Sequence, residues 1–298
     1  MRYFVQTLLL LCMTTITTAQ TGNNNKEQLI HNIQTELAKQ KGFYAVAFKD
    51  LQTGKTILWN EHENFHAAST MKTPVMIEVF KQAAAGKFSL HDSVLIKNEF
   101  KSIVDSSAYR LNPADDSEPE LYKRTGKKLL LSELVYQMII MSSNLATNII
   151  IEMVDGKNVT QTMRSLGAND IQVLRGVEDN KAFAKGLNNT TTAYDLMLIF
   201  EKIAKHEVVD ATACNEMIRI LLDQQHNTLI PALLPKEVKV AHKTGWITGV
   251  HHDSGIVFLP DGKKYVLVIL SKKLEDEEAA TKAMARVSAM IYEYVVGK

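Results

Sequence analysis

Ser69 and Lys72 are the first residues of the chain whose types and spacing could do chemistry together. Residues three apart on a helix lie on one face, about one turn apart, so a hydroxyl and an amine at this spacing can meet. A serine hydroxyl becomes an effective nucleophile when a neighbouring base takes its proton, and a lysine with a depressed pKa can be that base. The pair alone is weak evidence, because Ser69 also suits a helix N-cap and Lys72 a solvated surface.

Two further polar motifs follow this pair along the chain. Ser142-Ser143-Asn144 lies between two helical segments, and Lys243-Thr244-Gly245 lies at the end of an apolar strand. Each motif alone is ordinary, since the first could cap the following helix and the second could be a plain strand end. Arg124-Thr125-Gly126 looks similar to the second but stands in a polar loop with no strand on either side, which sets it aside.

The ordered set Ser-x-x-Lys, Ser-Ser-Asn and Lys-Thr-Gly resembles that of the class A β-lactamases and penicillin-binding serine hydrolases. The resemblance extends over nearly the whole chain, from about Lys26 to the end. It implies an α+β fold of the serine β-lactamase/DD-peptidase type, with an antiparallel sheet flanked by helices and an inserted, mostly helical domain. The family usually has Asp where this chain has Ser143, a change that we read as tolerable because that position is thought to brace the fold.

In the chemistry that this resemblance implies, Ser69 attacks the carbonyl carbon of an amide or β-lactam and becomes acylated. Lys72, with its pKa depressed by apolar surroundings and by Lys243, is the base or proton relay. Ser142 passes a proton to the leaving nitrogen, and the backbone N–H groups of Ser69 and Trp246 form the oxyanion hole. The groups expected to bind substrate are Asn144, Lys243, Thr244, Gly245 and Trp246.

Release of the acyl group is the step for which the sequence is least orthodox. The commonest class A enzymes carry a Glu-x-x-Leu-Asn pattern in a long loop, and this chain lacks that pattern. The corresponding loop begins at Arg175, and Glu178 is the candidate for the acid that activates water. Glu178 could equally form an ion pair with Arg175 that pins the loop, and Asp179 competes for either role.

A second departure from the family concerns the residue that binds the carboxylate of the substrate. Some relatives hold it with an Arg on the strand after Lys-Thr-Gly, but no Arg lies between residues 246 and 270 here. His251 and His252 are in range to replace that Arg, although loop histidines are more often simply solvated.

Two polar segments, 102–127 and 175–189, are too long and too polar for tight connections, and long loops in a compact domain are often functional. The first segment carries Tyr109 and Tyr122. We expect one of these two tyrosines to line the mouth of the cleft.

Hydrophobic periodicity predicts the elements that position the motifs. Strands are expected at 43–49, 56–60, 238–242, 255–258 and 265–270. Helices are expected at 26–40, 75–85, 131–141, 144–153, 192–204 and 212–223, and near the C-terminus, where Ala280, Met284, Val287, Ile291 and Tyr294 form a stripe. Strands at both ends predict one antiparallel sheet built from both termini. We place an α/β domain at 20–80 plus 235–298 and a helical domain at 81–234, with the site in the crevice between them.

The composition, 46% hydrophobic and 22% charged over 298 residues, is ordinary for a soluble globular protein. The 34 basic and 33 acidic residues form no basic run. Nucleic acid and membrane surfaces are therefore not expected as partners. Nothing in the sequence demands more than a monomer, and the enzyme that the resemblance implies acts on a small molecule without metal or cofactor.

The first 19 residues have the pattern of a secretory signal. A short apolar run, Leu8 to Cys12, follows Arg2 and leads to small residues before Gln20, and it is too short to span a membrane. This pattern predicts a secreted protein, periplasmic in a Gram-negative source. Cys214 would then be the only cysteine of the mature chain, which excludes an internal disulfide and a cysteine-based metal site.

The leading hypothesis is a secreted serine hydrolase that opens the β-lactam ring through an acyl-Ser69 intermediate. One alternative is a D-Ala-D-Ala peptidase or another cell-wall serine hydrolase with the same acylating residues. The other is a penicillin-binding sensor that is acylated once and stays so. The three differ in the group that releases the acyl chain.

Overall fold

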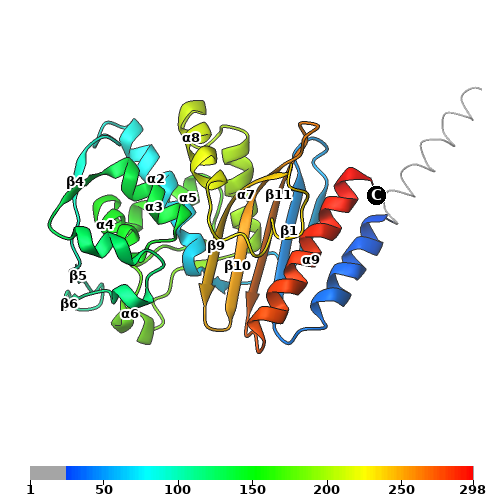
Figure 1. Cartoon of the computed structure of the whole chain (residues 1–298), viewed down its shortest axis with the longest axis horizontal. Coiled ribbons are helices and arrows are strands. Elements are labelled where there is room, and N and C mark those ends of the chain that lie inside the picture. The colour runs from blue at the N-terminus through cyan, green and yellow to red at the C-terminus, as the bar shows by residue number, and fades with distance from the viewer. Residues whose placement is uncertain (1–24, 298) are drawn as a thin grey trace, which may run out of the picture.

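The computed structural model describes residues 25–297, and the predicted signal segment lies outside them. Its centre is a five-stranded sheet in the order β2-β1-β11-β10-β9 (Figure 1). The strands are β1 (Phe43–Asp50), β2 (Thr56–Trp59), β9 (Lys239–Ile247), β10 (Val250–Phe258) and β11 (Lys264–Lys272). All pairings are antiparallel, and β1 pairs with β11, so the two ends of the chain meet in mid-sheet. The predicted fold class is confirmed.

Alternating side chains of each strand feed two separate cores, as the two-residue period of a strand requires. In β1, Tyr44, Val46 and Phe48 belong to a core shared with α9 (Glu277–Val296) and with the helical residues 25–37. The intervening residues Ala45 and Ala47 face the larger core of the central helices. Figure 1 shows α9 and the N-terminal helix side by side over one face of the sheet, and α7 (Ala193–Ala204) packs on β1, β10 and β11 from the other.

The middle of the chain supplies the remaining helices. They are α2 (Lys72–Ala84), α3 (Leu131–Ile140), α4 (Asn144–Val154), α5 (Gly156–Ser165), α6 (Asn180–Ala184) and α8 (Ala211–Leu222). Three 3₁₀ turns, η1 (Ala68–Met71), η2 (Pro113–Asp115) and η3 (Pro119–Arg124), punctuate the loops. Small two-stranded ladders pair β3 (Phe65–His66) with β8 (Thr190–Thr191), β4 (Ser93–Leu95) with β7 (Lys128–Leu130), and β5 (Phe100–Lys101) with β6 (Ala108–Tyr109). The proposed boundaries of the two domains stay a prediction.

The largest difference from the predicted elements is the length of β9 and β10. The expected strands 238–242 and 255–258 extend through the polar residues between them, with Thr244 opposite Asp253 and Trp246 opposite His251. Sequence patterns indicate a buried strand by its apolar residues, so the polar parts of β9 and β10 were not predicted as strands. The first helix ends at residue 37 rather than 40 and closes in a turn.

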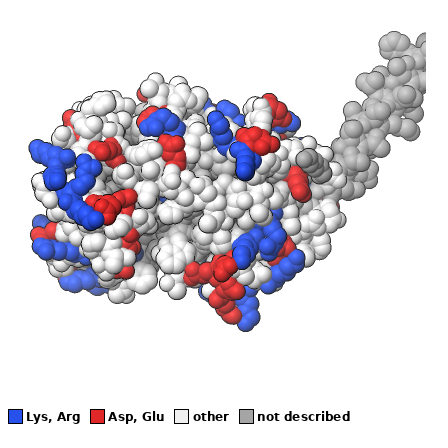
Figure 2. Space-filling model, in the orientation of Figure 1, with Lys and Arg blue, Asp and Glu red and all other residues white. Residues whose placement is uncertain are grey.

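Two surface properties accompany this fold. None of the helices in residues 25–297 is both long enough and apolar enough to cross a membrane. On the face shown in Figure 2, basic and acidic side chains stand beside one another, as the nearly balanced composition leads one to expect.

Candidate active site

The Ser69–Lys72 pair lies where η1 runs into α2. Ser69 is in the 3₁₀ turn and Lys72 is the first residue of the α-helix, so the predicted single helix is in fact two joined helical segments. Because the 3₁₀ turn has about three residues per turn, positions i and i+3 still share a face. Ser69 is partly exposed and Lys72 is fully buried, so one presents its hydroxyl to the cleft while the other lies behind it.

Two buried lysines converge on the hydroxyl of Ser142. The Nζ atoms of Lys72 and Lys243 lie 3.2 and 3.1 Å from Ser142 Oγ, and Lys72 also donates to the Ser142 carbonyl oxygen at 2.6 Å. Burial lowers the pKa of Lys72 to about 7. Burial and the neighbouring charge of Lys72 lower the pKa of Lys243 well below its ordinary value. A neutral lysine is therefore accessible near pH 7, as a base for Ser69 requires.

Asn144, the first residue of α4, joins this lysine to the loop that follows α5. Its Oδ1 accepts a hydrogen bond from Lys72 Nζ at 3.0 Å, and its Nδ2 donates to Glu178 Oε1 at 3.2 Å. The predicted acylation residues and the predicted water-activating acid thus share one amide.

Glu178 is half-buried and its carboxylate faces the cavity. Burial raises its pKa, and the nearby Asp115 and Asp116 carboxylates add to the rise, while the Asn144 amide opposes it. The loop is fixed one residue earlier, because the side-chain amide of Asn148 bonds both the N–H and the C=O of Val177, at 2.7 and 3.0 Å.

Two alternatives for this loop are wrong. Arg175 does not pair with Glu178; its guanidinium donates to the carbonyls of Gly176 and Leu187 and to Asn188 Oδ1. Asp179 is buried outside the cavity lining, where it caps α6 and accepts hydrogen bonds from Ser102 Oγ and Ile103 N. The hydrogen-bond partners of both side chains are backbone groups and neutral side chains of the loop and its neighbours, and not Glu178. Arg175 and Asp179 therefore stabilise the conformation of the loop.

The edge strand β9 passes directly over the nucleophile. A Cβ placed on Gly245 would lie 3.1 Å from Ser69 N and 3.0 Å from Thr70 N. A side chain here would force the neighbouring backbone to give by a few tenths of an ångström, so glycine suits this close approach. The close contact supports an oxyanion hole made of the N–H groups of Ser69 and of Trp246, the residue after Gly245.

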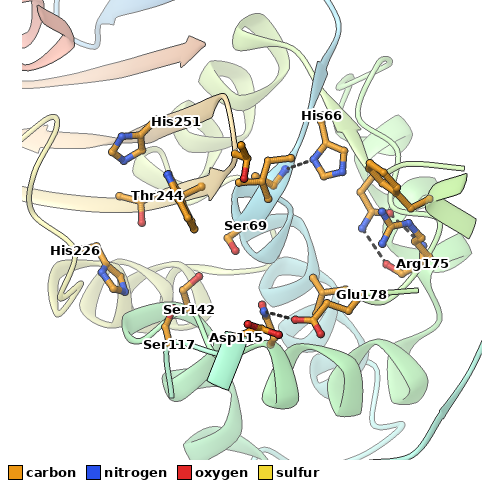
Figure 3. A pocket seen from close by; sticks show the side chains of 18 of the residues that line it. His66, Ser69, Asp115, Ser117, Ser142, Arg175, Glu178, His226, Thr244 and His251 are labelled. Carbon is orange, nitrogen blue, oxygen red and sulfur yellow. Dashed lines mark hydrogen bonds between the residues drawn. The ribbon is translucent and has the colours of Figure 1, made fainter. Parts of the chain in front are cut away.

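The site residues surround one cavity of about 750 Å³ (Figure 3). The predicted residues that line it are Ser69, Ser142, Asn144, Glu178, Thr244 and Trp246. Lys72 and Lys243 lie buried behind Ser142, within hydrogen-bonding distance of it. The indole of Trp246 is 61% exposed and donates to Glu277 on α9, so its side chain forms part of the rim.

The two candidate histidines of β10 have different positions. His251 lines the cavity, and its Nδ1 lies 2.6 Å from Thr281 Oγ1. His252 is fully buried; its Nδ1 accepts from Ser271 N, and its Nε2 faces the His66 carbonyl oxygen at 2.9 Å. Burial lowers the His252 pKa to about 4. Successive side chains of a strand point to opposite faces of the sheet, so His252 points away from the cavity that His251 lines and cannot take the substrate carboxylate.

Neither tyrosine of segment 102–127 lines the main cavity, so that prediction is wrong. Tyr109 faces a smaller cavity, and the hydroxyl of Tyr122 donates to Asp116 at 2.8 Å. The same segment instead brings Asp115 and Ser117 to the cleft.

Several cleft residues carried no sequence signal. They are His66, Asp115, Ser117, Phe183, His226 and Thr228. They lie in loops, in the two-residue strand β3, in the turn η2 and in the short helix α6, and only their membership of long polar segments could have directed attention to some of them.

The site combines the groups that an acyl-transfer hydrolase needs. They are a serine next to a buried lysine of low pKa, a second hydroxyl that contacts two lysines, and a half-buried carboxylate. Residues 28–295 match the family model described as the β-lactamase enzyme family. The chain therefore belongs to the class A β-lactamase family.

Individual relatives are distant but cover nearly the whole chain. A β-lactamase of Bacteroides uniformis is 24% identical, with 98% of each chain covered. β-Lactamase ROB-1 of Haemophilus influenzae is 26% identical over 84% of this chain and 78% of its own. Among solved structures, PBP-A superposes with a TM-score of 0.78 at 25% identity, covering 91% of this chain and 97% of its own.

Proposed function

We propose that the protein hydrolyses β-lactams through an acyl-Ser69 intermediate, as a monomeric and secreted enzyme. The observation that carries this proposal is the position of Asn144, whose amide contacts both Lys72 and Glu178. A hydrolase needs one group to form the acyl-enzyme and another to release it, and Asn144 brings the two candidates to the same cavity.

Acylation begins when Lys72 takes the Ser69 proton and Ser69 Oγ attacks the lactam carbonyl carbon. The negative charge that develops on the carbonyl oxygen meets the N–H groups of Ser69 and Trp246. As the C–N bond breaks, the Ser142 hydroxyl gives its proton to the ring nitrogen and recovers one from Lys72. This direction of transfer is supported by the two lysine amines that face Ser142 Oγ, since they leave its hydrogen free to point elsewhere.

Release of the acyl group is assigned to Glu178. Its carboxylate takes a proton from a water molecule as the water oxygen attacks the acyl carbon. The bond from the acyl carbon to Ser69 Oγ then breaks, and Glu178 returns the proton to the leaving Ser69 oxygen. The raised pKa of Glu178 makes it a stronger base than an ordinary carboxylate.

A second candidate function is penicillin binding without turnover. It is favoured by the likeness to PBP-A, of which a mutant was solved as an acyl-enzyme complex with penicillin G; that structure is 26% identical with a TM-score of 0.78. The two functions share Ser69 and Lys72 and differ at Glu178.

Mixing the protein with a chromogenic cephalosporin separates the two functions. We expect sustained turnover at a rate proportional to enzyme concentration. A burst of about one equivalent followed by no further hydrolysis would identify a slow penicillin binder instead. Cleavage of a D-Ala-D-Ala peptide, without sustained turnover of the cephalosporin, would identify a peptidase. Secretion is tested by whether the chain produced in a bacterial host loses its first 19 residues.

A further inference from the structure

Ser143, the middle residue of the Ser142-Ser143-Asn144 motif, lacks the carboxylate that the family usually carries at this position. Ser143 is fully buried, and its Oγ accepts one hydrogen bond, from Ala146 N at 3.2 Å. It therefore caps one N–H of the first turn of α4. The N–H groups of Asn144 and Leu145 need other acceptors, because no N–H in the first turn of a helix has an intrahelical partner.

Asp116 supplies those acceptors from a segment 28 residues away in sequence. The Asn144 N–H lies 3.0 Å from both carboxylate oxygens, and the Leu145 N–H lies 2.9 Å from Oδ2. The same carboxylate accepts from Glu118 N and from the Tyr122 hydroxyl. Asp116 is 7% exposed, so this is a buried anion with several donors at the positive end of a helix.

We propose that Asp116 is a positioning residue of the active site, which replaces the carboxylate missing at Ser143 and holds Asn144 between Lys72 and Glu178. Its bonds fix the backbone of Asn144, and the side chain of that residue contacts both reacting groups. This inference rests on the proposed function, because it concerns the same acylation step.

The charge of Asp116 also acts on Lys72. Among the groups facing Lys72, burial in apolar surroundings lowers its pKa while Asp116 and then Glu178 raise it. Lys243 shares its Ser142 partner, and His226 lies on the same side of the cleft. Removing the Asp116 charge should therefore let Lys72 lose its proton at lower pH.

The test compares acylation of the full protein by benzylpenicillin, in single-turnover experiments between pH 5 and 9. For Asp116→Asn we expect the acid limb of the rate to move down by about one pH unit. We also expect the acylation rate on the plateau to fall about tenfold. The NH₂ group of the new asparagine cannot accept the hydrogen bonds that the backbone N–H groups of Asn144 and Leu145 donate to the carboxylate.

Two further variants separate positioning from general damage. Tyr122→Phe removes one donor to Asp116 but keeps the carboxylate and its bonds to α4, so the wild-type acid limb should be retained. The double variant Asp116→Asn with Ser143→Asp returns a carboxylate to the start of α4. It should recover most of the lost rate and move the acid limb back towards that of the wild type.

The outcomes are distinct. A wild-type rate and acid limb in Asp116→Asn would overturn the inference, and so would a double variant that folds but recovers nothing. If Asp116→Asn does not fold, recovery of folding and acylation in the double variant supports the inference, and failure of both overturns it. A wild-type protein that penicillin does not acylate at all would overturn the proposed function itself.

Discussion

Lys72 and Lys243 approach one hydroxyl oxygen, that of Ser142, at 3.2 and 3.1 Å, although 171 positions separate them in the chain. Both amines are fully buried. Burial lowers the pKa of both lysines, and the neighbouring charge of Lys72 lowers that of Lys243 further, so the pair gives up a proton more readily than either lysine would in water. The site thereby obtains a base near neutral pH without a histidine in that role.

The pH dependence of acylation should report this base. With the Lys72 pKa at about 7, the fraction of neutral Lys72 rises as pH increases through that value, and the acylation rate should rise with it. Single-turnover rates with benzylpenicillin from pH 5 to 9 would measure this rise, the acid limb of the pH–rate profile. A limb that disappears in Glu178→Gln would assign the acylation base to Glu178 and contradict the role given to Lys72.

Gly245→Ala should slow acylation through crowding alone. The added Cβ would lie 3.0 to 3.1 Å from the backbone nitrogens of Thr70 and Ser69, which moves β9 away from the oxyanion position. Loss of a well-placed oxyanion donor costs about 100-fold in rate, and a partial displacement should cost about 10-fold or more. The melting temperature serves as the control, since a variant that loses stability and rate in parallel would not support a local effect.

His252 should make the protein less stable in acid. Its pKa is lowered from 6.5 to about 4 in the folded state, so between these values the unfolded chain binds a proton that the folded chain does not. Stability should fall as pH decreases from 6.5 towards 4, by up to about 3 kcal/mol from this residue.

Denaturant unfolding of the wild type and His252→Gln at pH 7 and pH 4.5 would measure this contribution. The variant should be less stable at pH 7, because Gln cannot reproduce both ring contacts, but its stability should change less with pH. An equal loss of stability in the two proteins would show that other groups cause the acid sensitivity.

The sequence predicted the sheet and the three motifs well because each rests on a local pattern. Apolar runs mark β1 and β11, and the motif residues stand at fixed spacings beside them. Asp116 could not be predicted, since nothing local distinguishes it from Asp115, and only the fold brings it to the start of α4. His251 and His252 were inseparable for a similar reason: with the strand β10 hidden by its own polar residues, the side facing the cleft was undetermined.

The loop after α5 shows the same limit. Its charged residues Arg175, Glu178 and Asp179 suggested ion pairs, yet Arg175 and Asp179 are satisfied mainly by backbone groups and neutral side chains. Arg175 and Glu178 line the cavity and Asp179 does not; this outcome depends on the path of the backbone, and Glu178 itself has a positive φ of 60°. Residue types alone do not contain that path.

The central claim is that Ser69 takes up the acyl group and Glu178 releases it. It is tested most directly by intact-mass and peptide mass spectrometry of Glu178→Gln mixed with benzylpenicillin, beside the wild type and Ser69→Ala. We predict a covalent adduct on Ser69 that forms at nearly the wild-type rate and persists at least about 100 times longer, with none in Ser69→Ala. Unchanged turnover in Glu178→Gln, or label that survives in Ser69→Ala, would contradict the account.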